Sequence, residues 1–74
     1  MRIKPVDMQI KVNNETLEIQ PPFSVLNLVQ KIKGNNTNGI AIAINNAVVP
    51  RIQWEKTQLK ENDNALIIQA TQGG

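Results

Sequence analysis

The sequence closes with Gly73-Gly74, and this pair is the part of the chain best suited to chemistry. Glycine has no Cβ and adopts unusual backbone angles readily, so two of them at a chain end are expected to form a thin, flexible tail. Such a tail can carry the Gly74 carboxylate, an anion at neutral pH, into a narrow active site on another protein. The alternative is an end that frays without a role, or a remnant of cloning.

The remaining residues offer few groups for catalysis. The chain has no His, Cys or Tyr, and its only serine, Ser24, stands where a helix cap is expected. Neither an activated nucleophile nor a tuned acid–base pair can be assembled from what is left. We therefore expect no catalytic residue, no metal site and no bound cofactor, and we interpret the protein as one that presents a group to an enzyme.

Length and charge further limit the kinds of protein to which the chain can belong. Seventy-four residues make one small domain with a thin core. Eight basic and six acidic residues give a net charge of +2, and the only aromatic residues are Phe23 and Trp54, so a nucleic-acid partner is not expected. No segment is long and apolar enough for a membrane span, and no secretory signal is recognisable, which predicts a cytoplasmic protein.

The elements that must position the tail can be predicted from periodicity. Alternating apolar residues predict strands, and Asn13-Asn14 and Asn45-Asn46 supply turns between them. Ser24 and Gly34 bracket a helical pattern. The expected elements are strands at 8–12 and 16–20, a helix at 24–33, strands at 40–44 and 47–49, an irregular turn at 51–56 and a last strand at 65–70.

This order predicts an α+β protein with the β-grasp, or ubiquitin-like, fold. One helix packs on a mixed five-stranded sheet, and the last strand lies centrally and parallel to the first. In that last strand Leu66 and Ile68 are expected to point inward. We divide the chain into an N-terminal extension (1–7), the β-grasp domain (8–70) and a flexible tail (71–74).

Three short motifs together resemble the ThiS family of sulfur carriers. They are Ala43-Ile44-Asn45, the Val49-Pro50-Arg51-x-x-Trp54 element and the terminal Gly-Gly, and the resemblance covers most of the chain from Met8 onward. The turn before the last strand departs from the family pattern, because Asn62 stands where glycine is usual. Asparagine tolerates a left-handed backbone, so we expect the turn to be kept.

The resemblance implies the chemistry of the tail. A ThiF-type activating enzyme would use ATP and magnesium to adenylate the Gly74 carboxylate. Sulfur from a persulfide donor would then displace AMP and leave a thiocarboxylate, which thiazole synthase (ThiG) would consume in thiamin biosynthesis. The side-chain-free Gly73 would ease passage into the partner's active site.

Docking requires a surface near the exit of the tail. Val49, Pro50, Ile52 and Trp54 are the predicted docking residues, and Arg51 is predicted to pair with an acidic group of the partner. Each has a simpler interpretation: Trp54 as core filler, Pro50 as the end of a strand and Arg51 as a solvated charge.

Two other functions share this fold and tail. A MoaD-like carrier would supply sulfur for molybdopterin, but such chains often have prolines before Gly-Gly and this chain has none there. A ubiquitin-like modifier commonly has arginine before Gly-Gly, where this chain has Gln72. A plain interaction domain, in which the glycines have no function, is a further alternative.

Overall fold

The structure is a computed structural model that describes residues 7–70. The expected tail at 71–74 and nearly all of the expected N-terminal extension lie outside the described residues. The elements follow the predicted order: β1 (Met8–Val12), β2 (Glu15–Ile19), α1 (Val25–Lys33), β3 (Ile40–Ile44), β4 (Ala47–Val48), the 3-10 helix η1 (Arg51–Gln53) and β5 (Asn64–Gln69).

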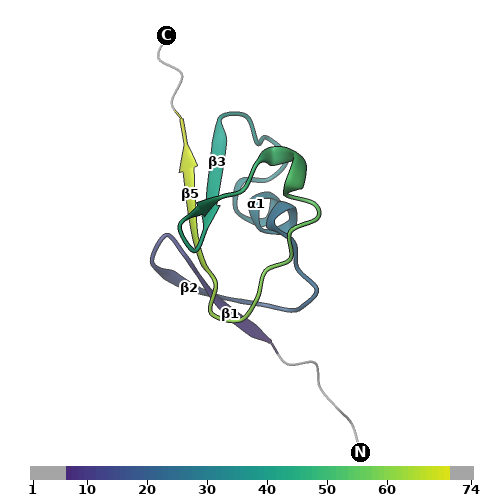
Figure 1. Cartoon of the computed structure of the whole chain (residues 1–74), viewed down its shortest axis with the longest axis vertical. Helices are drawn as coiled ribbons and strands as arrows, with labels where there is room; N and C mark the ends of the chain where they lie inside the picture. The colour runs from purple at the N-terminus through teal and green to yellow at the C-terminus, as the bar shows by residue number, and fades with distance from the viewer. Residues whose placement is uncertain (1–6, 71–74) are drawn as a thin grey trace, which may run out of the picture.

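The five strands form one mixed sheet in the order β2-β1-β5-β3-β4. β1 and β5 are parallel, whereas the other neighbouring strands are antiparallel. Helix α1 lies beside one face of this sheet (Figure 1). The predicted β-grasp arrangement, with the last strand central and parallel to the first, is therefore confirmed.

Asparagines in left-handed backbone conformations make the tight turns. Asn13 and Asn14 have φ of 50° and 72°, and Asn45 and Asn46 have φ of 52° and 72°. Asn62 has φ of 69°, so the turn that departs from the family pattern is kept, as expected. Asparagine is suited to these positions because its short polar side chain tolerates this conformation.

Helix α1 is capped at both ends by the residues that the sequence indicated. The Ser24 hydroxyl accepts a hydrogen bond from the Asn27 backbone N–H at 3.1 Å, and the Asn27 side chain accepts one from the Ser24 backbone N–H at 3.0 Å. Gly34, with φ of 72°, ends the helix. The Gly34 N–H also donates to the Gln30 carbonyl at 2.8 Å. These contacts satisfy N–H and carbonyl groups that the helix itself leaves without partners.

The core lies between α1 and the sheet. Alternate residues of the strands meet the apolar stripe of the helix, and Trp54 and Leu59 close one side. The buried apolar residues are Ile10, Val12, Ile19, Val25, Leu28, Val29, Ile40, Ile42, Trp54, Leu59, Ala65 and Ile67.

The expectation for the faces of β5 was wrong. Ala65 and Ile67 are the buried residues, whereas Leu66 and Ile68 are 49% and 55% exposed. Register is the reason: Leu66 pairs with Ala43 and Ile68 with Ala41, so both lie on the sheet face that α1 does not cover. Ile67 pairs with the buried Ile42 on the other face.

Within residues 7–70, no helix has the length and apolar character needed to cross a bilayer.

Candidate functional site

The structure describes the point from which the predicted tail starts. Gly73 and Gly74, the predicted reacting residues, lie outside the described residues. The last pairing between β3 and β5 joins Ile40 to Gln69, and the Ala70 N–H then donates to the Gly39 carbonyl at 2.8 Å. Ala70, the last residue that the structure describes, is held at the end of the sheet by this backbone hydrogen bond.

Gly39 is required at this point by its geometry. Its φ is +74°, a conformation that L side chains rarely adopt. A Cβ at this position would also lie 3.2 Å from the Ala70 carbonyl oxygen. Glycine therefore allows the loop before β3 to approach the end of β5 closely.

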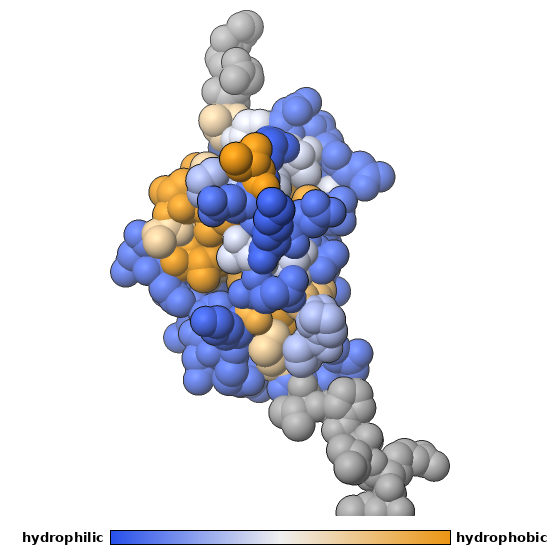
Figure 2. Space-filling model, turned by 45° about the vertical axis from the view of Figure 1, so that its right-hand side comes forward, coloured by the Kyte–Doolittle hydropathy of each residue, from blue (hydrophilic) through white to orange (hydrophobic). Residues whose placement is uncertain are grey.

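The uncovered sheet face beside this point is apolar. The central strand β5 contributes Leu66 and Ile68, and β4 contributes Val48, which is 74% exposed. Small side chains separate them, because Ala43 pairs with both Leu66 and Val48, and Ala41 pairs with Ile68. We call these five residues the open face; Figure 2 shows hydrophobic residues gathered on the side where the sheet lies.

Sequence reasoning missed most of the open face, although a signal for it was present. β3 has isoleucines on one side and alanines on the other, so both of its faces are apolar. In a protein made of one sheet and one helix, a strand with two apolar faces indicates that the sheet face without a helix also presents apolar surface.

The predicted docking segment divides into exposed and buried residues. Ile52 is 85% exposed and Pro50 is exposed, while Val49 is partly buried. Trp54 is only 2% exposed, and its indole N–H donates to the Val49 carbonyl at 2.9 Å. Trp54 is therefore packed in the core of this structure, which favours its simpler interpretation as core filler.

Arg51 already has partners within the chain. Its guanidinium donates to the Thr37 hydroxyl at 2.7 Å and to the Thr37 carbonyl at 2.6 Å. The same group lies over the Trp54 ring, with Cζ 4.7 Å from the ring centroid. The structure thus gives the Arg51 charge an intramolecular role that the sequence did not predict.

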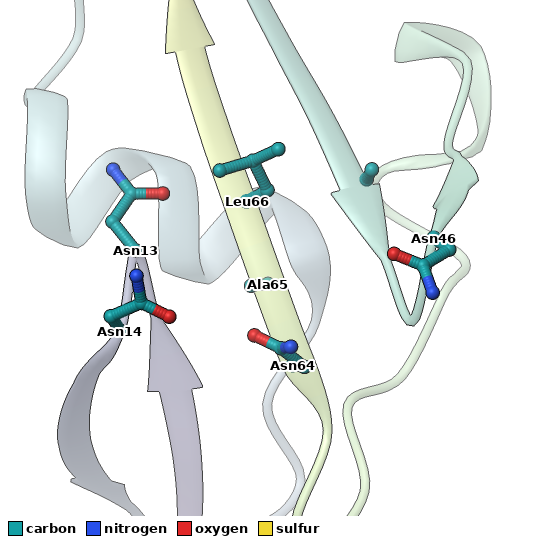
Figure 3. A pocket seen from close by; sticks show the side chains of 7 residues that line it. Asn13, Asn14, Asn46, Asn64, Ala65 and Leu66 are labelled. Atoms are coloured by element: carbon teal, nitrogen blue, oxygen red, sulfur yellow. The ribbon is translucent and has the colours of Figure 1, made fainter.

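Neutral amides surround a hollow on the sheet side of the molecule, at the start of β5. Asn13 and Asn14 approach it from the β1–β2 turn and Asn46 from the β3–β4 turn, with Asn64 and Leu66 between them (Figure 3). Its lining contains no ionisable side chain. This hollow can form hydrogen bonds, but its own side chains cannot act as a general acid or base at neutral pH.

The Asn13 side chain also has a structural role beside this hollow. Its amide oxygen accepts from the Ile67 N–H at 2.8 Å, and its amide nitrogen donates to the Ile67 carbonyl at 3.2 Å. The side chain thus continues the pairing of β1 with β5 beyond the end of β1. Among residues 7–70, no cluster of three or more His, Cys, Asp or Glu side chains is placed to hold a metal ion.

Comparison with known proteins identifies the family. The family model named ThiS matches residues 8–74. The sulfur carrier protein ThiS of Escherichia coli is 31% identical over 67 residues, which cover 90% of this chain and all of that protein. The crystal structure of the thiamine biosynthesis protein ThiS from Geobacter metallireducens superimposes with a TM-score of 0.74. It covers 90% of this chain and all of that one at 20% identity, a likeness that supports the fold alone. The chain therefore belongs to the ThiS family.

Proposed function

We propose that this protein carries sulfur on its C-terminal Gly74 for thiazole formation in thiamin biosynthesis. The observation that carries the proposal is the extent of the family match, which runs to residue 74 and so includes the terminal glycine pair. The match to the sulfur carrier protein of Escherichia coli supports the same role. The protein would act in the cytoplasm, where ATP and the partner enzymes are available.

The chemistry begins with activation of an unreactive group. In a ThiF-type enzyme, a Gly74 carboxylate oxygen attacks the α-phosphorus of magnesium-bound ATP, and pyrophosphate leaves. The terminal sulfur of a persulfide donor then attacks the acyl carbon, and AMP leaves. The product is an acyl disulfide that joins Gly74 to the donor. A thiol then attacks the donor's sulfur atom, forms a new disulfide with the donor and releases the thiocarboxylate that ThiG consumes.

The carrier must place its C-terminus in the active site of the enzyme while its folded domain binds the enzyme surface. Four residues separate Ala70 from the end of Gly74, and a fully extended chain of that length spans at most about 14 Å. An enzyme that receives Gly74 must therefore contact the carrier close to the end of β5. The open face meets this condition, because two of its residues, Leu66 and Ile68, belong to β5 itself.

We therefore assign docking of the activating enzyme to the open face in place of Trp54. Leu66 and Ile68 are about half exposed. Covering the exposed half of each side chain would contribute about 1–1.5 kcal/mol, from the transfer free energy of such residues. Ile68→Ala should therefore raise the KM for activation about five- to tenfold, with little effect on kcat.

Ile52→Ala is the matched control for this docking surface. Among residues 7–70, Ile52 is the most exposed of the large apolar residues, but it belongs to η1 and not to the sheet. If Ile52→Ala raised KM while Ile68→Ala did not, the segment predicted from sequence would be the docking surface and the open face would be excluded.

The mass of the intact protein tests the carrier function. The chain is incubated with the activating enzyme of its own organism, ATP, magnesium and a persulfide donor. A gain equal to the replacement of oxygen by sulfur is expected for the wild type and not for a chain that lacks Gly74. Adding ThiG and the remaining thiazole precursors should return the mass to its starting value, whereas sulfur delivery only to molybdopterin synthase would favour the MoaD-like alternative. An unchanged mass with demonstrably active partners would refute the proposal.

A further inference from the structure

The loop between α1 and β3 contacts two distant parts of the chain at once. At one end Gly39 accepts the hydrogen bond from Ala70, the last described residue before the tail. Two residues earlier, Thr37 accepts two hydrogen bonds from Arg51 at the start of η1. Figure 1 shows this loop and η1 at the end of the molecule where β5 ends.

The Thr37 carbonyl links these two contacts. It accepts one hydrogen bond from Arg51 Nη2 and another from the Ile40 N–H at 3.4 Å, which closes a tight turn over residues 37–40. Gly39 lies inside this turn with φ of +74°, and the turn directs its carbonyl toward Ala70. Arg51 is therefore bonded to the turn that holds the end of β5.

Contact with Trp54 also constrains the position of Arg51. Its guanidinium lies over the face of Trp54, which is 2% exposed and is hydrogen-bonded through its indole N–H to Val49. A planar guanidinium can donate two hydrogen bonds in a fixed fork while it stacks on an aromatic ring. Lysine has a single ammonium group and cannot reproduce that geometry.

We propose that Arg51, Thr37 and Gly39 form a clamp that sets the position and direction in which the chain leaves the sheet, and that they act as positioning residues for activation of Gly74. This inference rests on the proposed carrier function. When the four residues after Ala70 are extended to reach the active site of the partner, they have little slack to absorb a shift at the end of β5. Misplacing a reacting group by about 1 Å can cost about a hundredfold in rate.

Arg51→Lys and Arg51→Met separate the clamp from a direct charge contact with the partner. Both should lower kcat for adenylation about tenfold or more while KM stays close to the wild-type value, because the open face is unchanged. Arg51→Lys should not restore kcat, because lysine keeps the positive charge but cannot donate two hydrogen bonds in the fixed geometry of a guanidinium. Lys56→Met, which removes an exposed cation elsewhere, is the control and should leave both constants unchanged.

Amide hydrogen exchange reports the clamp without any enzyme. In both Arg51 variants the Ala70 N–H should exchange several-fold faster, whereas the Lys11 N–H, bonded to the Asp63 carbonyl in the body of the domain, should not change. Gly39→Ala should speed exchange at Ala70 in the same way. Combining it with Arg51→Lys should lower kcat no further than the more severe single change, because both act on one contact.

Three results would overturn the clamp. One is wild-type kinetics in Arg51→Lys together with a raised KM in Arg51→Met, which would show a direct charge contact. Another is an unchanged Ala70 exchange rate in every variant. The third is equal acceleration at Ala70 and Lys11, which would show general destabilisation. A wild-type chain that active partners never adenylate would instead refute the proposed function, and the role of the clamp in activation with it, while the exchange rates still decide whether the clamp holds Ala70.

Discussion

Replacing Trp54 tests whether this residue belongs to the core or to a docking surface. The side chain is 2% exposed and its indole N–H donates to the Val49 carbonyl. Truncating a buried tryptophan to alanine costs about 3–5 kcal/mol. A domain of this length has a total stability of about 4–11 kcal/mol, so Trp54→Ala should remove a large part of it.

Trp54→Phe separates the hydrogen bond from the buried ring. Phenylalanine keeps most of the apolar contact but leaves the Val49 carbonyl without its donor, which should cost about 1–2 kcal/mol. For a domain of this size, that loss corresponds to a Tm lower by about 5–15 °C. The ranking predicted from the structure is therefore wild type, then Trp54→Phe, then Trp54→Ala.

The assay measures denaturant unfolding of each variant and, on the same samples, binding to the activating enzyme. Ile52→Ala serves as the control, since Ile52 lies in the neighbouring turn but is 85% exposed and should change stability by less than about 0.5 kcal/mol. The reasoning would be refuted if Trp54→Ala unfolded at the wild-type denaturant concentration but failed to bind the activating enzyme. That result would return Trp54 to the docking surface.

Two further sets of substitutions test side-chain hydrogen bonds that stabilise the fold. Ser24→Ala removes the cap of α1 and should lower the free energy of unfolding by about 1 kcal/mol, whereas Ser24→Gly should lower it by only a few tenths; equal losses would count against the cap. Asn13→Gly keeps the left-handed turn but removes both side-chain hydrogen bonds to Ile67, at an expected cost of about 1–2 kcal/mol measured by the same unfolding assay. Unchanged stability there would show that backbone pairing alone joins β1 to β5.

The sequence was sufficient to predict most of the fold because its local signals agree with each other. The alternation in β1, the cap at Ser24 and the paired asparagines each identify an element without knowledge of the others. Once the order of elements is known, few compact arrangements can cover one apolar helix face with a sheet.

The faces of β5 could not be predicted in the same way. Ala65-Leu66-Ile67-Ile68 is a continuous apolar run, which has no alternation to show which residues point inward. Placing Leu66 and Ile68 in the core was wrong, because register with β3 puts both residues on the open face. Such a register depends on pairing with a strand more than twenty residues earlier in the chain.

The role of Arg51 was hidden for a similar reason. Its partner Thr37 is 14 residues away and belongs to a loop without a periodic pattern. From sequence alone, an arginine near an expected docking segment cannot be distinguished from one that holds a loop in place. The chemistry proposed for Gly73 and Gly74 rests on residue type and on a family match that runs to residue 74, and it remains a proposal to be tested.

Locating the sulfur on the chain tests the central claim most directly. No Lys or Arg follows Lys60, so trypsin releases the C-terminus as the single peptide 61–74, and no Cys is present to take up sulfur as a persulfide. After incubation with the activating enzyme, ATP and a persulfide donor, fragmentation of this peptide should place the oxygen-to-sulfur replacement on Gly74. A peptide 61–74 of unchanged mass, from partners that activate another carrier in the same mixture, would contradict the account.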